Sequence, residues 1–466
     1  MPRTAEKIEK FLFYLFLFLI PFQIRFIWIP PVGGEWDSIF LYLTDILLAA
    51  VLFLGIINAK TRGLRFKKID LFLFLFLAVA VISVFVSADK TVSIFRWVKL
   101  LEFVLLYIYI SAQFKIQNSK FKITTVLSVI FYSGMLQAIL AIVQFYKQSS
   151  LGLKFIEAGK YLPGDPGVAT FISGTEKVMR AYGSFPHPNV LSAFLLLAIF
   201  CLYALWLNKT KIGPIEPIGL MLLIFALFLT FSRGTILVFL FISFIFLIAR
   251  FFQLRELYHT EERLAMGKRM MALALLFVLF STISALLVLP YFKTRFLKIS
   301  LQEEAIDLRF FYTKIALSII KEKPFLGIGI GEFADFSRHY PAFLRAANKF
   351  YHYGDMTGQE IPEWLYQPAH NLYLLIASEI GIFGALLFLL FVLIKFIKSI
   401  GRIKPQELSD LIGPMIFLFG GFLILGFNDH YFWTLQSGGI MFWLALALME
   451  KSNIKMQNDN VKLKTL

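Results

Sequence analysis

Long apolar runs dominate this 466-residue chain and constrain its fold more than any other feature. A membrane-spanning helix needs about 20 mostly apolar residues, and the chain supplies such runs almost from end to end. Hydrophobic residues make up 58% of it, including 54 Phe, against about 45–50% in a typical soluble domain. The runs are continuous rather than alternating, which argues against a β-barrel. The sequence therefore predicts an all-α integral membrane protein with about 12 transmembrane helices.

The apolar runs predict one integrated membrane domain in four parts. Residues 1–290 hold transmembrane helices 1 to 9, and residues 291–369 form a large loop. Residues 370–450 hold helices 10 to 12, and residues 451–466 form a tail. Lys and Arg gather in the connectors 59–69, 113–122, 208–216, 253–270 and 395–408. Because basic short loops face the cytoplasm, we expect both termini to be cytoplasmic and the large loop to be extracytoplasmic.

Charge and cysteine content narrow the possible partners. The net charge is +16, but the basic residues lie in connectors between spans, so the sequence offers no basic face for nucleic acid. We expect membrane lipids as partners and no nucleic acid. The single cysteine, Cys201, lies inside an apolar run. It allows neither a disulfide within the chain nor a metal site built from cysteines.

The large loop is expected to be partly helical and to lie on the membrane surface. Apolar residues recur with a helical period from Ala305 to Ile320. The segment Pro324–Gly331 then ends that helix with a glycine-rich turn. Aromatic residues are frequent from 336 to 366, and such rings prefer the bilayer interface.

Three short polar elements fall at one predicted depth, near the outer membrane interface. They are Arg180–Asn189, Thr230–Gly234 and Pro368–Asn371. Arginine offers rigid, forked donors that stay charged, so a pair of them suits a diphosphate. A histidine is the natural group to accept a proton from a sugar hydroxyl near neutral pH. The pattern predicts a catalytic set of Arg180, Arg233 and His370.

Each member of this set also has a simpler interpretation. Arg233 can be a residue that extends to the interface from a helix end. Arg180 can pair with Glu176 or be solvated, and His370 can be an interfacial residue without a proton role. His187 is a rival for the role of base, but it is flanked by prolines and is expected to be structural.

Other polar residues of the apolar runs are secondary candidates. Arg96, Lys99 and Glu102 share one face of a helix, where they line a cavity or form a self-contained ion pair. Asp45 and Glu379 are expected to be satisfied inside the bundle. The pair Asp429 and His430 lies in an outer turn and can assist the site.

The three elements, in this order, resemble the O-antigen ligase and polymerase superfamily of bacterial membrane proteins. The pattern continues through Arg309, Lys323–Phe333 and Pro368–Gly384. In the last segment, His-Asn leads into an apolar helix that contains an acidic residue and glycines. The resemblance covers about residues 175–450.

This resemblance implies a glycosyltransferase of the C-type architecture in the bacterial cytoplasmic membrane. Such enzymes, which build cell-surface polysaccharide and lipopolysaccharide, move a glycan from a polyprenyl diphosphate to an acceptor on the extracytoplasmic face. It implies that Arg180 and Arg233 hold the diphosphate and that His370 activates the hydroxyl of a glycolipid or glycan acceptor. No cofactor and no metal are expected. Further substrate-binding candidates are Asn371, Asn189, Arg96, Arg309 and Asp429.

The sequence does not distinguish among several activities. An O-antigen ligase is the first hypothesis, and an O-antigen polymerase would use the same donor to extend another carrier-linked glycan. A protein O-oligosaccharyltransferase shares the His-Asn loop. A flippase for lipid-linked glycans belongs to a different class and would need a polar central cavity with alternating access.

Overall fold

A computed structural model describes most of the chain. The described residues are 2–29, 36, 38–58, 70–114, 121–153, 156–159, 161–165, 167–173, 175–208, 212–256, 261–292, 304–351, 361, 363–401 and 411–450. The basic connector 59–69 and the tail 451–466 lie outside them, as do parts of the other basic connectors, so the predicted orientation rests on sequence alone.

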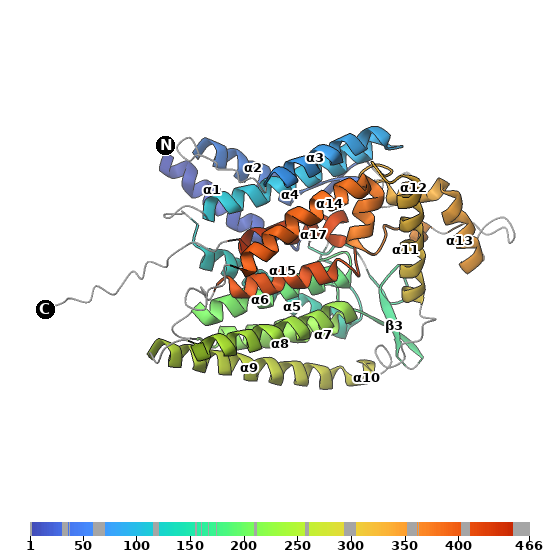
Figure 1. The fold of residues 1–466 in the computed structure, drawn as a ribbon. Coiled ribbons are helices and arrows are strands. Elements are labelled where there is room, and N and C mark those ends of the chain that lie inside the picture. The colour runs from blue at the N-terminus through green and yellow to red at the C-terminus, as the bar shows by residue number, and fades with distance from the viewer. Residues whose placement is uncertain are drawn as a thin grey trace.

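The described part of the chain is mostly helical (Figure 1). Among the described residues, five helices are long and apolar enough to cross a membrane: α5 (Ile123–Lys147), α6 (Pro188–Asn208), α8 (Arg233–Glu256), α9 (Glu261–Leu287) and α14 (Leu372–Ile400). Five more are apolar but shorter: α2 (Leu43–Asn58), α3 (Asp70–Ser83), α7 (Ile215–Leu229), α15 (Gly413–Leu425) and α17 (Gln436–Met449). Two further predicted spans correspond to α1 (Pro2–Leu19) and α4 (Lys90–Phe114), which carry charged residues along part of their length. The structure supports a helical membrane protein, while the count of 12 spans is not confirmed.

The fold is consistent with the all-α prediction, and the described residues add two small antiparallel hairpins between helices. Strand β1 (Arg25–Ile29) pairs with β2 (Ile39–Tyr42), and β3 (Thr170–Ser173) pairs with β4 (Glu176–Met179). The first helix ends at Leu19, and the chain that follows it forms strand β1. Most of the strands are rich in aromatic and β-branched residues, which favour extended backbone.

Helix α6 forms the centre of the core. All of its membrane-crossing window is buried, which fits a helix that is apolar on every side. It packs against α5, α7 and α15, and more weakly against α8, α9 and α17. The first residues of α6 are thereby fixed at one end of the bundle, directly after the predicted element Arg180–Asn189.

Short helices gather at the same end of the bundle. Helix α11 (Glu304–Glu322) runs across the bundle end, with α12 (Phe333–His339) and α13 (Pro341–Tyr351) beside it (Figure 1). The helix predicted over 305–320 is confirmed by α11. A second apolar cluster joins α11 and α13 to Leu375 of α14. The remaining short elements are η2 (Val84–Val86), α10 (Leu289–Phe292), η4 (Glu363–Leu365) and α16 (Tyr431–Thr434).

The glycine-rich segment after α11 locks into a break in α14. Gly381 has a φ of 85°, and a Cβ there would lie 2.0 Å from the carbonyl oxygen of Phe325. The Ile328 and Gly329 amides donate to carbonyls in the broken turn at 3.0 and 2.9 Å, and the Ile382 amide donates to Pro324 at 2.8 Å. The segment thus does more than end a helix, because it fixes the first half of α14, which begins beside His370.

Candidate functional site

A cavity of about 170 Å³ lies where α11 crosses the bundle. It is formed by the chain after β4, the start of α6, the turn between α7 and α8, α11, the chain before α14 and the chain before α16. Six of the eight predicted site residues line it: Arg180, Asn189, Arg233, Arg309, His370 and Asp429. Residues far apart in the sequence therefore meet in one site, as the resemblance implied for the two arginines and the histidine.

A chain of hydrogen bonds crosses one wall of this cavity. The Arg180 guanidinium donates to Asn189 Oδ1 at 2.7 Å, and Asn189 Nδ2 donates to Asp429 Oδ2 at 2.8 Å. The other Asp429 oxygen accepts from the His430 backbone amide at 2.9 Å. Asn189, predicted to bind substrate, thus holds a cation and an anion in fixed positions.

The tight turn between α7 and α8 forms a second wall. Arg180 Nε donates to the Thr230 carbonyl at 2.7 Å, which ties the first arginine to this turn. Phe231 adopts a left-handed φ of 47°, an uncommon conformation for a bulky residue that the surrounding packing must hold. Arg233 and Gly234, at the start of α8, line the cavity. The first amides of a helix point outward and favour an anion.

His370, in the chain before α14, packs between two rings. It stacks on Tyr312 of α11 with centroids 5.4 Å apart, and it meets His430 edge-on at 4.9 Å. Its Nδ1 atom is buried and has no hydrogen-bond partner within the described ranges. Burial lowers the pKa of His370; the charge of Asp429 opposes this shift, and Arg309 adds to it. The imidazole is therefore neutral near pH 7 and can accept a proton.

The neighbouring groups set the charge of the cavity. Burial lowers the pKa of His187 and of His430 to about 3, so both rings are neutral near pH 7. Burial raises the pKa of Asp429, but the electrostatic influence of the neighbouring histidine rings and of Arg309 brings it below its ordinary value. The cavity thus combines three arginines with one ionised carboxylate.

Two of the predicted substrate-binding residues lie outside this cavity. The Asn371 side chain accepts from the amides of Tyr373 and Leu374, both at 3.0 Å, so it is the N-cap of α14. Arg96 donates to the backbone carbonyls of Thr434 and Trp36 at 3.0 and 3.1 Å, and it lines a different, smaller cavity. The geometry gives both residues structural partners.

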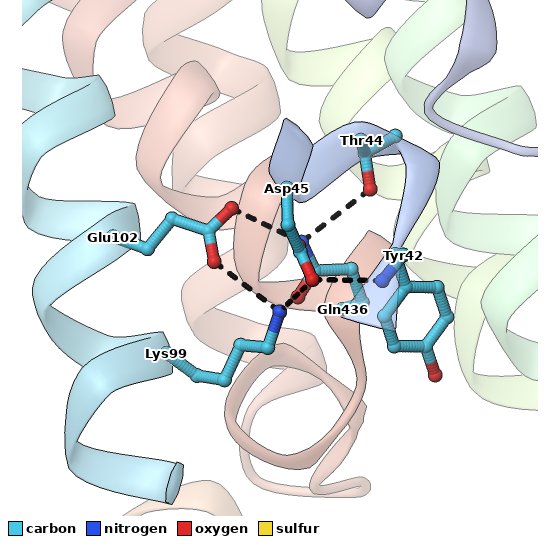
Figure 2. Close-up of polar contacts among 6 residues, drawn as sticks. All are labelled: Tyr42, Thr44, Asp45, Lys99, Glu102 and Gln436. Carbon is cyan, nitrogen blue, oxygen red and sulfur yellow. Dashed lines mark hydrogen bonds and ion pairs between the residues drawn. The ribbon is translucent and has the colours of Figure 1, made fainter. Parts of the chain in front are cut away.

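A buried polar network lies beside that smaller cavity (Figure 2). Lys99 of α4 forms ion pairs with Asp45 and with Glu102, and Gln436 of α17 donates to Asp45. Asp45 also accepts from the Tyr42 amide at 2.8 Å. The predicted polar stripe on α4 is thus a connection between α2, α4 and α17. Glu379 has a partner as expected, because it accepts from Trp433 at 2.8 Å.

Two residues at the site were missed or given another role in the sequence analysis. Tyr312, which stacks on His370, lies on the buried face of an amphipathic helix and gave no separate signal. His187 was expected to be only structural: its Nδ1 accepts from the Asn189 amide at 3.1 Å, yet it also lines the cavity. The described residues contain no group of three His, Cys, Asp or Glu side chains arranged to hold a metal ion.

The apolar helices indicate a membrane protein, and the cavity that three arginines line is its candidate site. A family model described as O-antigen ligase matches residues 218–389, from α7 into α14. The match confirms the resemblance to the O-antigen ligase superfamily, over a shorter stretch than the expected 175–450. It contains Arg233, Arg309 and His370, and it indicates a membrane enzyme of the ligase or polymerase kind. A comparison with curated proteins finds no match.

Proposed function

We propose that this protein is an O-antigen ligase-type glycosyltransferase. It transfers a glycan from a polyprenyl diphosphate to an acceptor hydroxyl at the extracytoplasmic face of the cytoplasmic membrane. The observation that carries the proposal is the single cavity that gathers Arg180, Arg233 and Arg309 around the neutral imidazole of His370. The family match supports the same reaction class.

The arginines receive the diphosphate of the donor. Guanidinium groups bind phosphate oxygens through paired hydrogen bonds, and the first turn of α8 adds backbone donors and the positive end of its dipole. The positive charge in the cavity stabilises the departing diphosphate, where negative charge develops in the transition state. We therefore expect transfer to continue when a chelator removes divalent metal ions.

His370 takes the acceptor proton. The acceptor oxygen forms a bond to the anomeric carbon while the bond from that carbon to the diphosphate oxygen breaks. The hydroxyl proton passes to the imidazole, and the electron pair of the broken bond leaves with the polyprenyl diphosphate. The direct displacement inverts the anomeric configuration. Asp429 stabilises the imidazolium that forms, since its charge favours the protonated ring.

The experiment uses the purified chain in proteoliposomes with a polyprenyl-diphosphate oligosaccharide and candidate acceptors. Carrier release and product size are followed together, with and without chelator. One discrete addition to the acceptor supports a ligase, and a ladder of products would assign a polymerase instead. Movement of the donor across the bilayer without carrier release would replace the proposal with a flippase.

A further inference from the structure

A larger groove of about 730 Å³ opens beside the arginine cavity. It lies between the end of α5, the β3–β4 hairpin and α10, at the end of the bundle that α11 crosses (Figure 1). Its lining includes three aromatic rings and four polar side chains: Phe145, Tyr146, Tyr291, Gln148, Ser173, Glu176 and Lys177. The site proposed above makes no use of this groove.

Side-chain hydrogen bonds of one residue fix the shape of the groove. Gln148 ends α5 in a left-handed conformation, with a φ of 54°. Its side chain accepts from the Met179 amide at 2.7 Å and donates to the Phe145 carbonyl at 2.6 Å. These bonds clamp β4 to the end of α5 and fix one edge of the groove against its floor.

Two features show that the groove adjoins the arginine cavity. Strand β4 carries Glu176 and Lys177 along the groove and leads directly into Arg180 of the cavity. At about 3.3 Å per extended residue, Glu176 lies on the order of 13 Å from Arg180 along the chain. Phe231 lines the cavity, and its ring lies 5.8 Å from Phe145 and 6.4 Å from Tyr291, which line the groove.

The lining chemistry favours an oligosaccharide as the occupant. Sugar rings present apolar faces that pack on aromatic rings, and their hydroxyls need polar partners at the edges. Tyr146 is 68% exposed, so its ring is open to a ligand. Glu176 and Lys177 are exposed at the rim. A polyprenyl chain would place apolar surface against these charged groups, which costs free energy.

We propose that this groove binds the sugars of the donor oligosaccharide that follow the one attached to the diphosphate. The inference rests on the proposed function, because it assumes that the diphosphate lies at Arg180. A donor with its diphosphate in the cavity places its glycan along β4, with Tyr146 stacking under a sugar ring. The groove then selects donors by the length and identity of their glycan.

The test uses lipid-linked oligosaccharide extracted from cells that make this protein. One part stays intact, and exoglycosidases trim the other part to the first sugar. The variant is Tyr146→Ala in the full chain, in proteoliposomes. Tyr132→Ala is the matched control, because Tyr132 is an exposed tyrosine of the same helix, 47% accessible, and lies outside the groove. Free oligosaccharide released from the carrier serves as a binding probe that needs no chemistry.

We expect Tyr146→Ala to raise KM for the intact donor roughly two- to tenfold, the effect of one aromatic contact, without lowering kcat. The KM for the trimmed donor and the Tyr132→Ala variant should match the wild type. Equal KM values of Tyr146→Ala and wild type for the intact donor would overturn the inference and leave the proposed function standing. A rise with both donors that depends on prenyl length would assign the groove to the lipid chain. Tyr146-dependent binding of free oligosaccharide without any transfer would keep the groove and overturn the proposed function.

Discussion

Asn189 connects a cation and an anion of the cavity, so replacing this side chain should strongly affect activity. Its side chain accepts from Arg180 at 2.7 Å and donates to Asp429 at 2.8 Å. Asn189→Ala removes both bonds and leaves the Asp429 oxygen without that donor. We expect the guanidinium and the carboxylate to lose their fixed positions while the fold remains, because α6 keeps its apolar contacts.

The magnitude follows from the two bonds. A hydrogen bond to a charged group contributes roughly 1.5–3 kcal/mol, so the pair amounts to roughly 3–6 kcal/mol. Arg180 retains its 2.7 Å bond to the Thr230 carbonyl, which favours the lower end. At about 1.4 kcal/mol per tenfold change, we expect kcat/KM to fall by about a hundredfold or more.

Carrier release from a polyprenyl-diphosphate donor in proteoliposomes measures the effect. Asn208→Ala is the matched control, since it removes the same side chain at the opposite end of α6, where its Oδ1 has no partner among the described residues. Asn189→Asp keeps the acceptor for Arg180 but sets an oxygen against Asp429, so it should not restore activity. A kcat/KM of Asn189→Ala within about threefold of the wild type would be a far smaller loss than two such bonds imply, and it would show that Asn189 does not position the two charged groups.

Three further predictions follow from the geometry. Because the pKa of His370 lies below its ordinary value of 6.5, the imidazole can still accept a proton at pH 6.5. The acid limb of kcat/KM should therefore lie below pH 6.5; a limb at higher pH would contradict this. His430 has a pKa of about 3 in the fold against 6.5 ordinarily. Below pH 6.5 the unfolded chain therefore binds more protons than the folded chain, so the free energy of unfolding should fall from pH 6.5 toward pH 3. The fall should be less steep in His430→Gln, and an equal slope of Tm against pH in both proteins would exclude this role of His430. Gly381→Ala should lower Tm strongly, because an added Cβ has no space there and the φ is 85°. Gly267→Ala is the control and should not lower Tm, because an added Cβ meets open space. A similar Tm in both variants would show that the break in α14 tolerates a side chain.

Much of the candidate site could be predicted because its chemistry requires rare residue types in an apolar sequence. Arg180, Arg233 and His370 stood out for that reason, and the structure brings them together. Their roles remain proposals. Asn371 was predicted to bind substrate, although an asparagine before a long apolar run is also the usual signal for an N-cap, which is what the structure gives it.

The rest could not be predicted, because it depends on which segments meet. The break at Gly381 is needed only because the Phe325 backbone approaches it closely, and no local pattern reveals that approach. The β3–β4 hairpin is too short to give a clear alternation of polar and apolar residues. Arg96 could equally have lined the main cavity, and its bond to Thr434 appears only in the folded chain.

The central claim is that the arginines hold the diphosphate and His370 takes the proton. The most direct test measures donor binding and carrier release side by side for wild type and His370→Ala. We expect His370→Ala to bind the donor about as tightly as the wild type but to release the carrier about 10²–10⁴-fold more slowly, the usual contribution of a general base. Carrier release at the wild-type rate in His370→Ala would contradict it.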